Sequence, residues 1–169
     1  MLSKISEARQ DKDYYTIDLI SDILSRGNSS RLYKELVKEK RLFSEINAFL
    51  TGNLDKGLFV ISGKLVKGVE MKTAEDAIEK QLQLIKQETV GERELTKIKN
   101  KMESALSFAE LDILNKAMNL AIAELLGDAN LINKEMENYL SVTSAQIHKE
   151  ANKIFTENNC STLYYLCEK

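Results

Sequence analysis

Apolar residues follow a helical period in the first part of the chain. Over residues 11–24 they recur every three or four positions, which predicts an amphipathic helix. Asp11 or Asp13 is expected to cap the start of this helix, and Gly27 can adopt the left-handed conformation that ends it. A second helix is expected to begin at residues 29–30, with its apolar side chains, among them Leu36, on one side.

The period then changes to the alternation that is typical of β-strands. Apolar and polar residues alternate over Phe43–Leu50, and a second apolar run occupies Leu58–Leu65. Residues 51–57 between them are rich in turn formers, so the two runs are expected to pair as antiparallel strands. Gly63 interrupts the second run, which predicts a bulge or the close approach of another element at that position.

The stretch from residue 73 to residue 156 is helical in pattern. A helix is expected to begin at Thr73. Thr89 and Glu92 have the spacing of a capping box, in which two side chains satisfy the first backbone N–H groups of a helix, and they predict the start of the next helix. The apolar stripe of that helix slips in phase over residues 107–112, so a kink or a break is expected there.

Two more signals divide the rest of this helical stretch. Gly127 is expected to interrupt it, and Thr143 with Gln146 has the spacing of a second capping box. After the last helix, the β-branched and aromatic run at residues 162–166 predicts a strand. The order of elements predicts an α+β fold of one domain, residues 1–169, in which helices pack on one face of a small, mostly antiparallel sheet.

Composition and charge narrow the classes of function. Hydrophobic residues make up 43% and charged residues 30% of the 169 residues, as in soluble globular proteins, and there is no proline to interrupt long helices. The 24 basic and 26 acidic residues give a net charge of −2, without the basic excess that is typical of nucleic-acid-binding proteins. No apolar run reaches the roughly 18 residues of a transmembrane helix. We therefore expect neither a nucleic acid nor a membrane as a partner.

Residue types that carry common catalytic and metal chemistry are scarce. His148 is the only histidine and matches no zinc-binding motif, so a structural role at the surface or half-buried is expected rather than a metal ligand. Cys160 and Cys167 are expected to be buried, reduced thiols, because an extended chain would place them roughly 23 Å apart, too far for a disulfide. Residues 62–65 contain Gly-Lys but lack the rest of a phosphate-binding loop.

Residues 13–33 are the most specific segment of the sequence. A helix that is expected to end at Gly27 is followed by Ser29-Ser30-Arg31-Leu32-Tyr33, and then by Leu36-Val37-Lys38-Glu39-Lys40. This order resembles the second-domain signature of the insulinase/pitrilysin-type zinc metallopeptidases, the inverzincins. Further similarities follow in the order of that family, so that the resemblance spans nearly the whole chain; they lie at residues 57–61, 91–100 and 142–147.

The resemblance implies that the chain is one half of a peptidase. Members of the family are built from paired, similar α+β domains that enclose a chamber; the first carries the zinc motif H-x-x-E-H, and the second, without metal ligands, closes the chamber. Because H-x-x-E-H is absent here, the chain is expected to be the C-terminal non-catalytic domain, N-terminally truncated and part of a longer chain. The family pattern has a further strand and helix region before Tyr14, which residues 1–10 are too short to supply in full.

The same resemblance bears on substrate binding. Non-catalytic domains that help to bind substrate carry an Arg and a Tyr, and alignment by Leu36 and Leu42 puts Val37 and Ser44 at those positions. The substrate-binding residues are therefore left unassigned, and no catalytic or metal-binding residue is expected in this domain. By analogy with two-chain members of the family, the domain is expected to belong to the zinc-bearing chain, whose partner chain would supply the Arg and the Tyr.

The functional hypothesis is a chamber-forming, non-catalytic domain of a zinc-dependent endopeptidase that cleaves peptides or unfolded polypeptides. Zinc is expected in the parent chain and not in this part of it. The implied partners are the upstream catalytic domain of the same chain, a second chain in a homodimer or heterodimer, and a peptide substrate. Phe43–Leu50 and Leu58–Leu65 are the expected chamber lining. The alternative is a non-proteolytic scaffold or interaction subunit of the same fold, and the compartment is left open between cytoplasm and periplasm.

Overall fold

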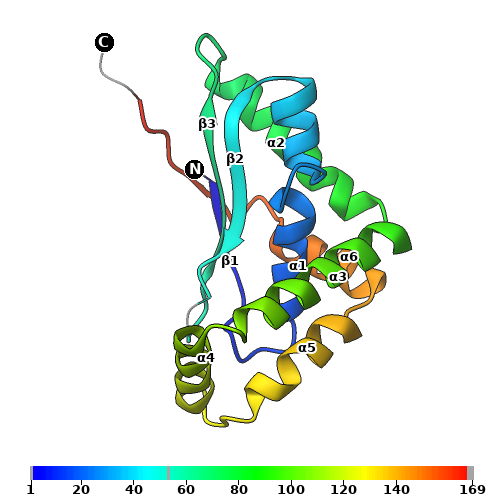
Figure 1. The fold of residues 1–169 in the computed structure, drawn as a ribbon. Helices are drawn as coiled ribbons and strands as arrows, with labels where there is room; N and C mark the ends of the chain where they lie inside the picture. The colour runs from blue at the N-terminus through cyan, green and yellow to red at the C-terminus, as the bar shows by residue number, and fades with distance from the viewer. Residues whose placement is uncertain (1, 53, 167–169) are drawn as a thin grey trace.

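Four antiparallel strands form one sheet, and helices pack on one of its faces (Figure 1). The computed structural model describes residues 2–52 and 54–166. Across the sheet the strands follow the order β2, β3, β1, β4. They are β1 (Leu2–Ile5), β2 (Phe43–Leu50), β3 (Leu58–Leu65) and β4 (Ser161–Thr162). The helices are α1 (Tyr14–Ser25), η1 (Tyr33–Glu39), α2 (Met71–Gln87), α3 (Glu92–Ala109), α4 (Ile113–Leu125), α5 (Leu131–Ser141) and α6 (Ser144–Ile154). The predicted α+β fold is confirmed.

The β2–β3 hairpin confirms the predicted antiparallel pair. The bulge in this hairpin lies in β2, between Phe43 and Glu45, and not in β3. Gly63 of β3 is nevertheless the site of a close approach, because a Cβ atom added to it would lie 2.7 Å from the ring of Phe43. The aromatic ring packs directly over the glycine, so any larger residue would displace it.

The sequence pattern does not predict β1, because a lysine of this strand faces the interior and an isoleucine faces the outside. Leu2 and Lys4 are buried, whereas Ile5 is 59% exposed. Lys4 is accommodated in the interior because its Nζ donates a hydrogen bond to the carbonyl oxygen of Thr156 at 2.9 Å. A charged residue on the inner face and an apolar residue on the outer face conceal this strand from a prediction based on periodicity.

β4 is shorter than the sequence predicts. We expect a strand over residues 162–166, but the structure has one only at Ser161–Thr162. Leu2 of β1 pairs with Thr162, and the described part of β1 begins at Leu2. Because a strand is defined by the neighbour to which it bonds, a high β-propensity alone does not extend β4 beyond this pair.

α1 is the central helix and packs between the sheet and helices α3, α5 and α6. Its completely buried side chains include Ile17, Leu19, Ile20 and Leu24. The predicted helix is confirmed, although it begins at Tyr14. The expected aspartate cap is wrong: Asp13 makes no side-chain cap, and the Asp11 carboxylate accepts a backbone N–H that lies before the helix. Gly27 follows the helix with a φ of 90°, in the left-handed region as predicted.

The second predicted helix is present but is wider than an α-helix. Tyr33–Glu39 is a π-helix, whose hydrogen bonds join residues five apart, as in the 2.9 Å bond from the Lys40 N–H to the Glu35 carbonyl oxygen. Leu36 is completely buried, and Val37 is half-buried against the core. The apolar pattern indicates a helix here but does not reveal its π geometry.

Two helix starts differ from the predicted ones. α2 begins at Met71 rather than Thr73. α3 begins after Gly91, which occupies the cap position with no side chain to act as a cap. The capping box predicted at Thr89 is therefore wrong, because the helix starts too far along the chain for that hydroxyl to reach its first turn.

The two interruptions of the helical stretch are confirmed. α3 ends at Ala109, inside the segment where the apolar stripe slips in phase, and α4 begins after Asp112. The Asp112 carboxylate accepts the N–H groups of Leu114 and Asn115, which stabilises the new start. Gly127 ends α4 with a φ of 99°.

The capping box at the start of α6 is confirmed in full. The Thr143 hydroxyl accepts the Gln146 N–H at 3.3 Å, and the Gln146 side-chain oxygen accepts the Thr143 N–H at 2.7 Å. Two of the unpaired backbone N–H groups at this helix start are thereby satisfied.

Thr143→Ala is expected to lower the free energy of unfolding by about 1 kcal/mol, because it removes the hydroxyl that caps α6. Thr89→Ala is the matched control and should change it by less than about 0.5 kcal/mol, since Thr89 is exposed and caps no helix. Urea denaturation followed by circular dichroism measures both values. Equal losses in the two variants would contradict the assignment of these caps.

Candidate functional site

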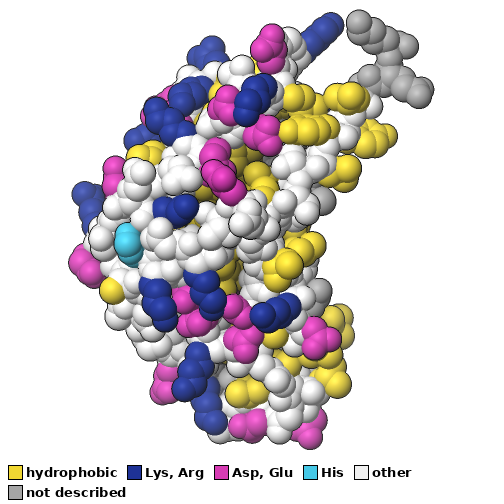
Figure 2. All heavy atoms as spheres, turned by 180° about the vertical axis from the view of Figure 1, so that it is seen from behind, with side chains coloured by type: hydrophobic (Ala, Val, Ile, Leu, Met, Phe, Trp, Pro, Cys, Tyr) yellow, Lys and Arg dark blue, Asp and Glu magenta, His cyan; other side chains and the backbone are white. Residues whose placement is uncertain are grey.

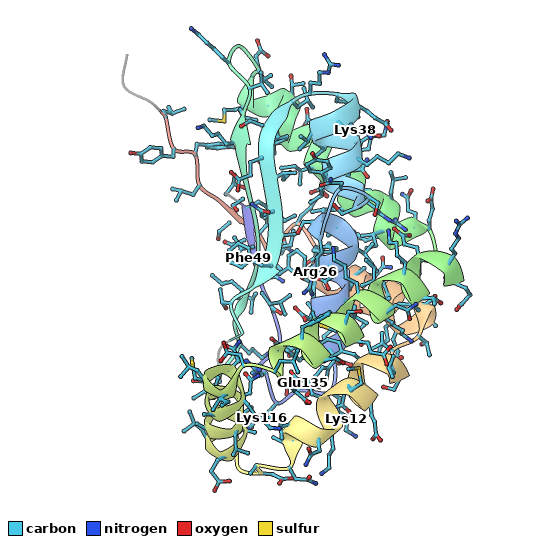
Figure 3. All side chains as sticks on the ribbon, in the orientation of Figure 1. Lys12, Arg26, Lys38, Phe49, Lys116 and Glu135 are labelled. Carbon is cyan, nitrogen blue, oxygen red and sulfur yellow. The ribbon has the colours of Figure 1, made fainter. Side chains whose placement is uncertain are left out.

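The face of the sheet opposite the helices is uncovered and carries an apolar cluster (Figure 1). Ile5 pairs with Leu58 and Phe49 pairs with Val60, so the four side chains share this face. Phe49 is 45% exposed, whereas Val60, in the middle strand of the three, is buried. Figure 3 places Phe49 on β2, on the side away from the helices. We call these four residues the open-face cluster.

The other end of the same face is polar. Asn47 pairs with Ser62, and Glu45 pairs with Lys64 across β2 and β3. The Asn47 side-chain amide also donates to the Glu45 carboxylate at 2.9 Å. The open face therefore changes along the strands from apolar side chains near the β2–β3 turn to hydrogen-bonding and charged groups at the far end.

A second apolar surface covers the end of α3 and most of α4. Ala123 is the buried residue of α4, and Ile113 at its start is 86% exposed. The large exposed apolar residues of this surface, which we call the α4 patch, are Phe108, Leu111, Ile113, Leu114, Met118 and Leu125. Figure 2 shows hydrophobic side chains along one side of the molecule, while Lys, Arg, Asp and Glu are spread over the rest of this view. An exposed apolar surface of this kind is typical of contacts with other proteins or domains.

The two positions that align with the family's Arg and Tyr lie on different elements. Val37 is half-buried on η1, and Ser44 is exposed at the start of β2. The Ser44 hydroxyl donates to the Lys64 carbonyl oxygen at 3.1 Å. Neither side chain carries a charge or an aromatic ring, so neither can replace the Arg or the Tyr of the family, and no substrate-binding residue is assigned.

The histidine and the cysteines occupy peripheral positions. His148 is half-buried on α6, as expected for a structural residue. Cys160 is a free thiol but is exposed just before β4, so its predicted burial is wrong; the short β4 leaves this segment at the margin of the sheet. Cys167 lies outside the described residues.

The described residues form no site for a metal ion. Within residues 2–52 and 54–166, no group of three or more His, Cys, Asp or Glu side chains is placed to hold one. Zinc needs three or four such ligands, so the chemistry of the donor set does not fit a zinc ion here. None of the helices in the described part of the chain combines the length and apolar character that a membrane span requires.

Two acidic side chains of α1, the half-buried Asp18 and the buried Asp22, form a cluster that the sequence pattern did not indicate. The Tyr139 hydroxyl donates to Asp18 Oδ2 at 2.7 Å, which joins α5 to α1. Burial raises the pKa of Asp18, and burial together with the neighbouring Asp18 carboxylate raises the pKa of Tyr139. Burial also raises the pKa of Tyr14 to about 12. Two aspartates on a helix that carries no other charged residue are the one signal that could have revealed this cluster.

Asp22, the second acid of this cluster, is buried. Its Oδ2 accepts a hydrogen bond from Arg26 Nη1 at 2.7 Å, near the end of α1 (Figure 3). Burial nevertheless raises the pKa of Asp22 to about 6, because the loss of hydration outweighs the opposing effects of Arg26 and Lys101. The carboxyl group therefore titrates near neutral pH.

A cavity of about 640 Å³ lies between the amino-terminal loop and the turn that joins α4 to α5. Arg9 and Glu135 line it, with 3.9 Å between Arg9 Nη2 and Glu135 Oε1. The Gln10 side chain spans its rim and donates to the Leu126 carbonyl oxygen at 2.7 Å. Arg9 and Glu135 thus neutralise each other inside the cavity, and Asp11, Lys12 and Asp128 add further charged groups to its lining.

Comparison with known proteins finds a matching family profile. The sequence profile described as the peptidase M16 inactive domain matches residues 1–102. No match was found in the comparison with curated protein sequences.

Solved structures share the fold. A protease from Helicobacter pylori is 22% identical with a TM-score of 0.89; the match covers 94% of this chain but only 38% of that one. The inactive peptidase domain of a candidate zinc protease from Bordetella parapertussis is also 22% identical, with a TM-score of 0.89, and covers 98% of this chain and 90% of that one. A chain of complex III from Candida albicans, at 13% identity and a TM-score of 0.81, covers 94% of this chain and 40% of that one.

Asp22→Asn is expected to flatten the pH dependence of stability. Because the pKa of Asp22 is raised from 3.8 to about 6 in the native state, the native protein holds a proton that the unfolded chain releases between these values. The stabilisation that protonated Asp22 provides is complete below its unfolded-state pKa of 3.8 and is lost as the pH rises through its native-state pKa of about 6. The native sequence should therefore lose on the order of 2 kcal/mol more than the variant between about pH 4 and pH 7.

Urea titrations of both proteins across this pH range provide the measurement. Asp18 and Glu135 also have raised pKa values and are present in both proteins, so the comparison isolates Asp22 together with its interaction with the Asp18 carboxylate. Equal slopes of stability against pH would contradict the assignment.

The 169-residue domain is expected to retain no stoichiometric zinc after incubation with excess metal and removal of the free ion. The reason is the lack of three converging ligands among the described residues. Inductively coupled plasma mass spectrometry gives the metal content. One zinc per chain would overturn this expectation.

Proposed function

Because the chain belongs to the family of peptidase M16 inactive domains, we propose that it forms part of the wall of a substrate chamber. The enzyme would be a zinc-dependent endopeptidase that cleaves peptides or unfolded polypeptides. Residues 1–169 would be one non-catalytic domain of this enzyme.

The observation that carries the proposal is the open face of the sheet. Helices cover one face, and the other exposes Ile5, Phe49 and Leu58 of the open-face cluster. An unfolded polypeptide can present apolar side chains and free backbone groups to such a surface, whereas a folded protein keeps most of its large apolar side chains inside. The change from the apolar end to the polar pairs at Glu45 and Lys64 gives a bound segment both kinds of contact.

The catalytic chemistry is proposed to lie in another part of a longer chain. When bound, a zinc ion polarises the scissile carbonyl and activates water, but the described residues of this chain do not fit such an ion. The role of this chain would be to bind and orient substrate and to exclude bulk water through its apolar surface. That this chain spans only 38% of the Helicobacter protease supports a larger parent molecule.

A non-proteolytic scaffold subunit is the second candidate, and the α4 patch favours it. Several large apolar side chains exposed together are typical of a surface that contacts other proteins or domains. The neighbour from Candida albicans is a chain of complex III, so a domain of this fold also occurs in a multi-subunit assembly. The α4 patch suits both candidates, because a chamber-forming domain also has to pack on the rest of its enzyme.

Peptidase activity of the complete protein that contains this sequence separates the chamber-wall function from the scaffold function. Hydrolysis of a reduced, carboxymethylated polypeptide by the complete protein would be measured with and without a zinc chelator. Hydrolysis that the chelator abolishes and added zinc restores supports the peptidase proposal. A folded complete protein without hydrolytic activity overturns it in favour of the scaffold.

Phe49→Lys in the complete protein is expected to lower kcat/KM for an unfolded polypeptide by about tenfold, because a charge replaces one apolar contact in the chamber wall. Leu140→Lys is the matched control: Leu140 is 43% exposed, similar to Phe49, but lies on α5 among the helices. It should leave kcat/KM unchanged.

Circular dichroism and zinc content of both variants verify that folding and metal loading are intact. If the two lysine variants behave alike, the open face is not part of the chamber wall.

A further inference from the structure

A groove of about 560 Å³ lies beside the amino end of β1. One wall is residues 62–65 of β3, and the other is the segment that follows β4, residues 163–165. Its floor is apolar and comes from Met71, Ala74 and Ile78 of α2. In Figure 1 the amino end of β1 lies between β3 and the segment after β4, so this strand points into the groove.

The residues of both walls continue the pairing registers of β1, so a strand that extended β1 at its amino end would have a partner on each side. Leu2 pairs with Ile61 on one side and with Thr162 on the other. Continuing the two antiparallel ladders, the second residue before Leu2 falls opposite Gly63 and Tyr164. The fourth falls opposite Leu65 and Leu166.

The backbone of β3 is oriented to bond with such a strand. The Ser6 N–H donates to the Gly57 carbonyl oxygen at 2.9 Å, which fixes one bonded pair of the β1–β3 ladder. In an antiparallel ladder every second residue directs its N–H and C=O to the same neighbour. Counting along β3 from Gly57, Gly63 and Leu65 direct their backbone groups into the groove.

The floor selects the side chains that this strand would carry. Leu2 is buried against the helices, so the second and fourth residues before it would face the same way. They would meet the apolar floor of α2 and the Phe43 ring that packs over Gly63. Tyr164 faces this side as well, because its hydroxyl donates to Glu75 Oε2 of α2 at 2.8 Å. Apolar residues at these two positions would complete the inner layer.

We propose that the groove holds an extended polypeptide segment joined to the amino side of Leu2, which continues β1 between β3 and the segment after β4. This segment bonds to Gly63 and Leu65 and places apolar side chains over α2. A covalently joined occupant is favoured because Leu2 itself lines the groove and both ladders of β1 lead into it. The inference rests on the proposed function in one respect, that the domain is part of a longer chain.

Two extensions of the 169-residue chain, identical in composition, test this proposal. Thr-Val-Thr-Val placed before the first residue puts valine at the second and fourth positions before Leu2. Val-Thr-Val-Thr puts threonine there and is the matched control. We expect the first extension to raise the Tm by about 3 °C or more over the control, and to slow amide exchange at Gly63 and Leu65 by about tenfold.

Equal Tm values and equal exchange for the two extensions would overturn the proposal. The proposal would also be overturned if a free peptide of the first sequence slowed amide exchange at Gly63 and Leu65 of the unextended chain while the attached extension did not. Neither readout involves peptide hydrolysis, so a failure here leaves the chamber proposal standing. Loss of the chamber proposal would likewise leave these stability and exchange results unchanged.

Discussion

The burial of α1 is the constraint on which the rest of the structure depends. This helix lies between the sheet and three other helices, so nearly its whole surface must be either apolar or paired. Its two acids meet this requirement in different ways: Asp18 binds the Tyr139 hydroxyl of α5, and Asp22 binds Arg26 on its own helix. Because α3, α5 and α6 all gather around α1 on one side, the opposite face of the sheet is left without a cover. The proposed functional surface is thus a consequence of how the core is built.

Features with a local physical cause could be predicted from the sequence. The cap of α6 depends on two side chains three residues apart, Thr143 and Gln146, and the turn after α1 depends on the conformational freedom of Gly27. The β2–β3 hairpin follows from alternation over two adjacent runs, and the break before α4 follows from a slip in the phase of the apolar stripe. In each case the residues that determine the feature are neighbours in the chain.

Features that depend on distant partners could not be predicted. Lys4 is tolerated inside β1 because its ammonium group donates a hydrogen bond to the carbonyl oxygen of Thr156, far along the chain. The length of β4 depends on where β1 runs beside it, not on the aromatic residues after Thr162. For the candidate surface, periodicity indicates that the apolar residues of α4 pack against another element, but it does not say whether that element belongs to the same domain. In the structure Ile113 and its neighbours are exposed. The family, by contrast, was identifiable because its motifs are short segments in a fixed order.

The pairing of β1 with β4 has a mechanical consequence. The two strands are antiparallel neighbours, so the amino end of β1 and the carboxyl end of β4 lie at the same end of the sheet. Tension applied through these two ends would load the hydrogen bonds between the strands one after another instead of all at once, because those bonds lie perpendicular to the strands. The domain would yield to such a force by unzipping from this edge, and the layer around α1 would be reached last.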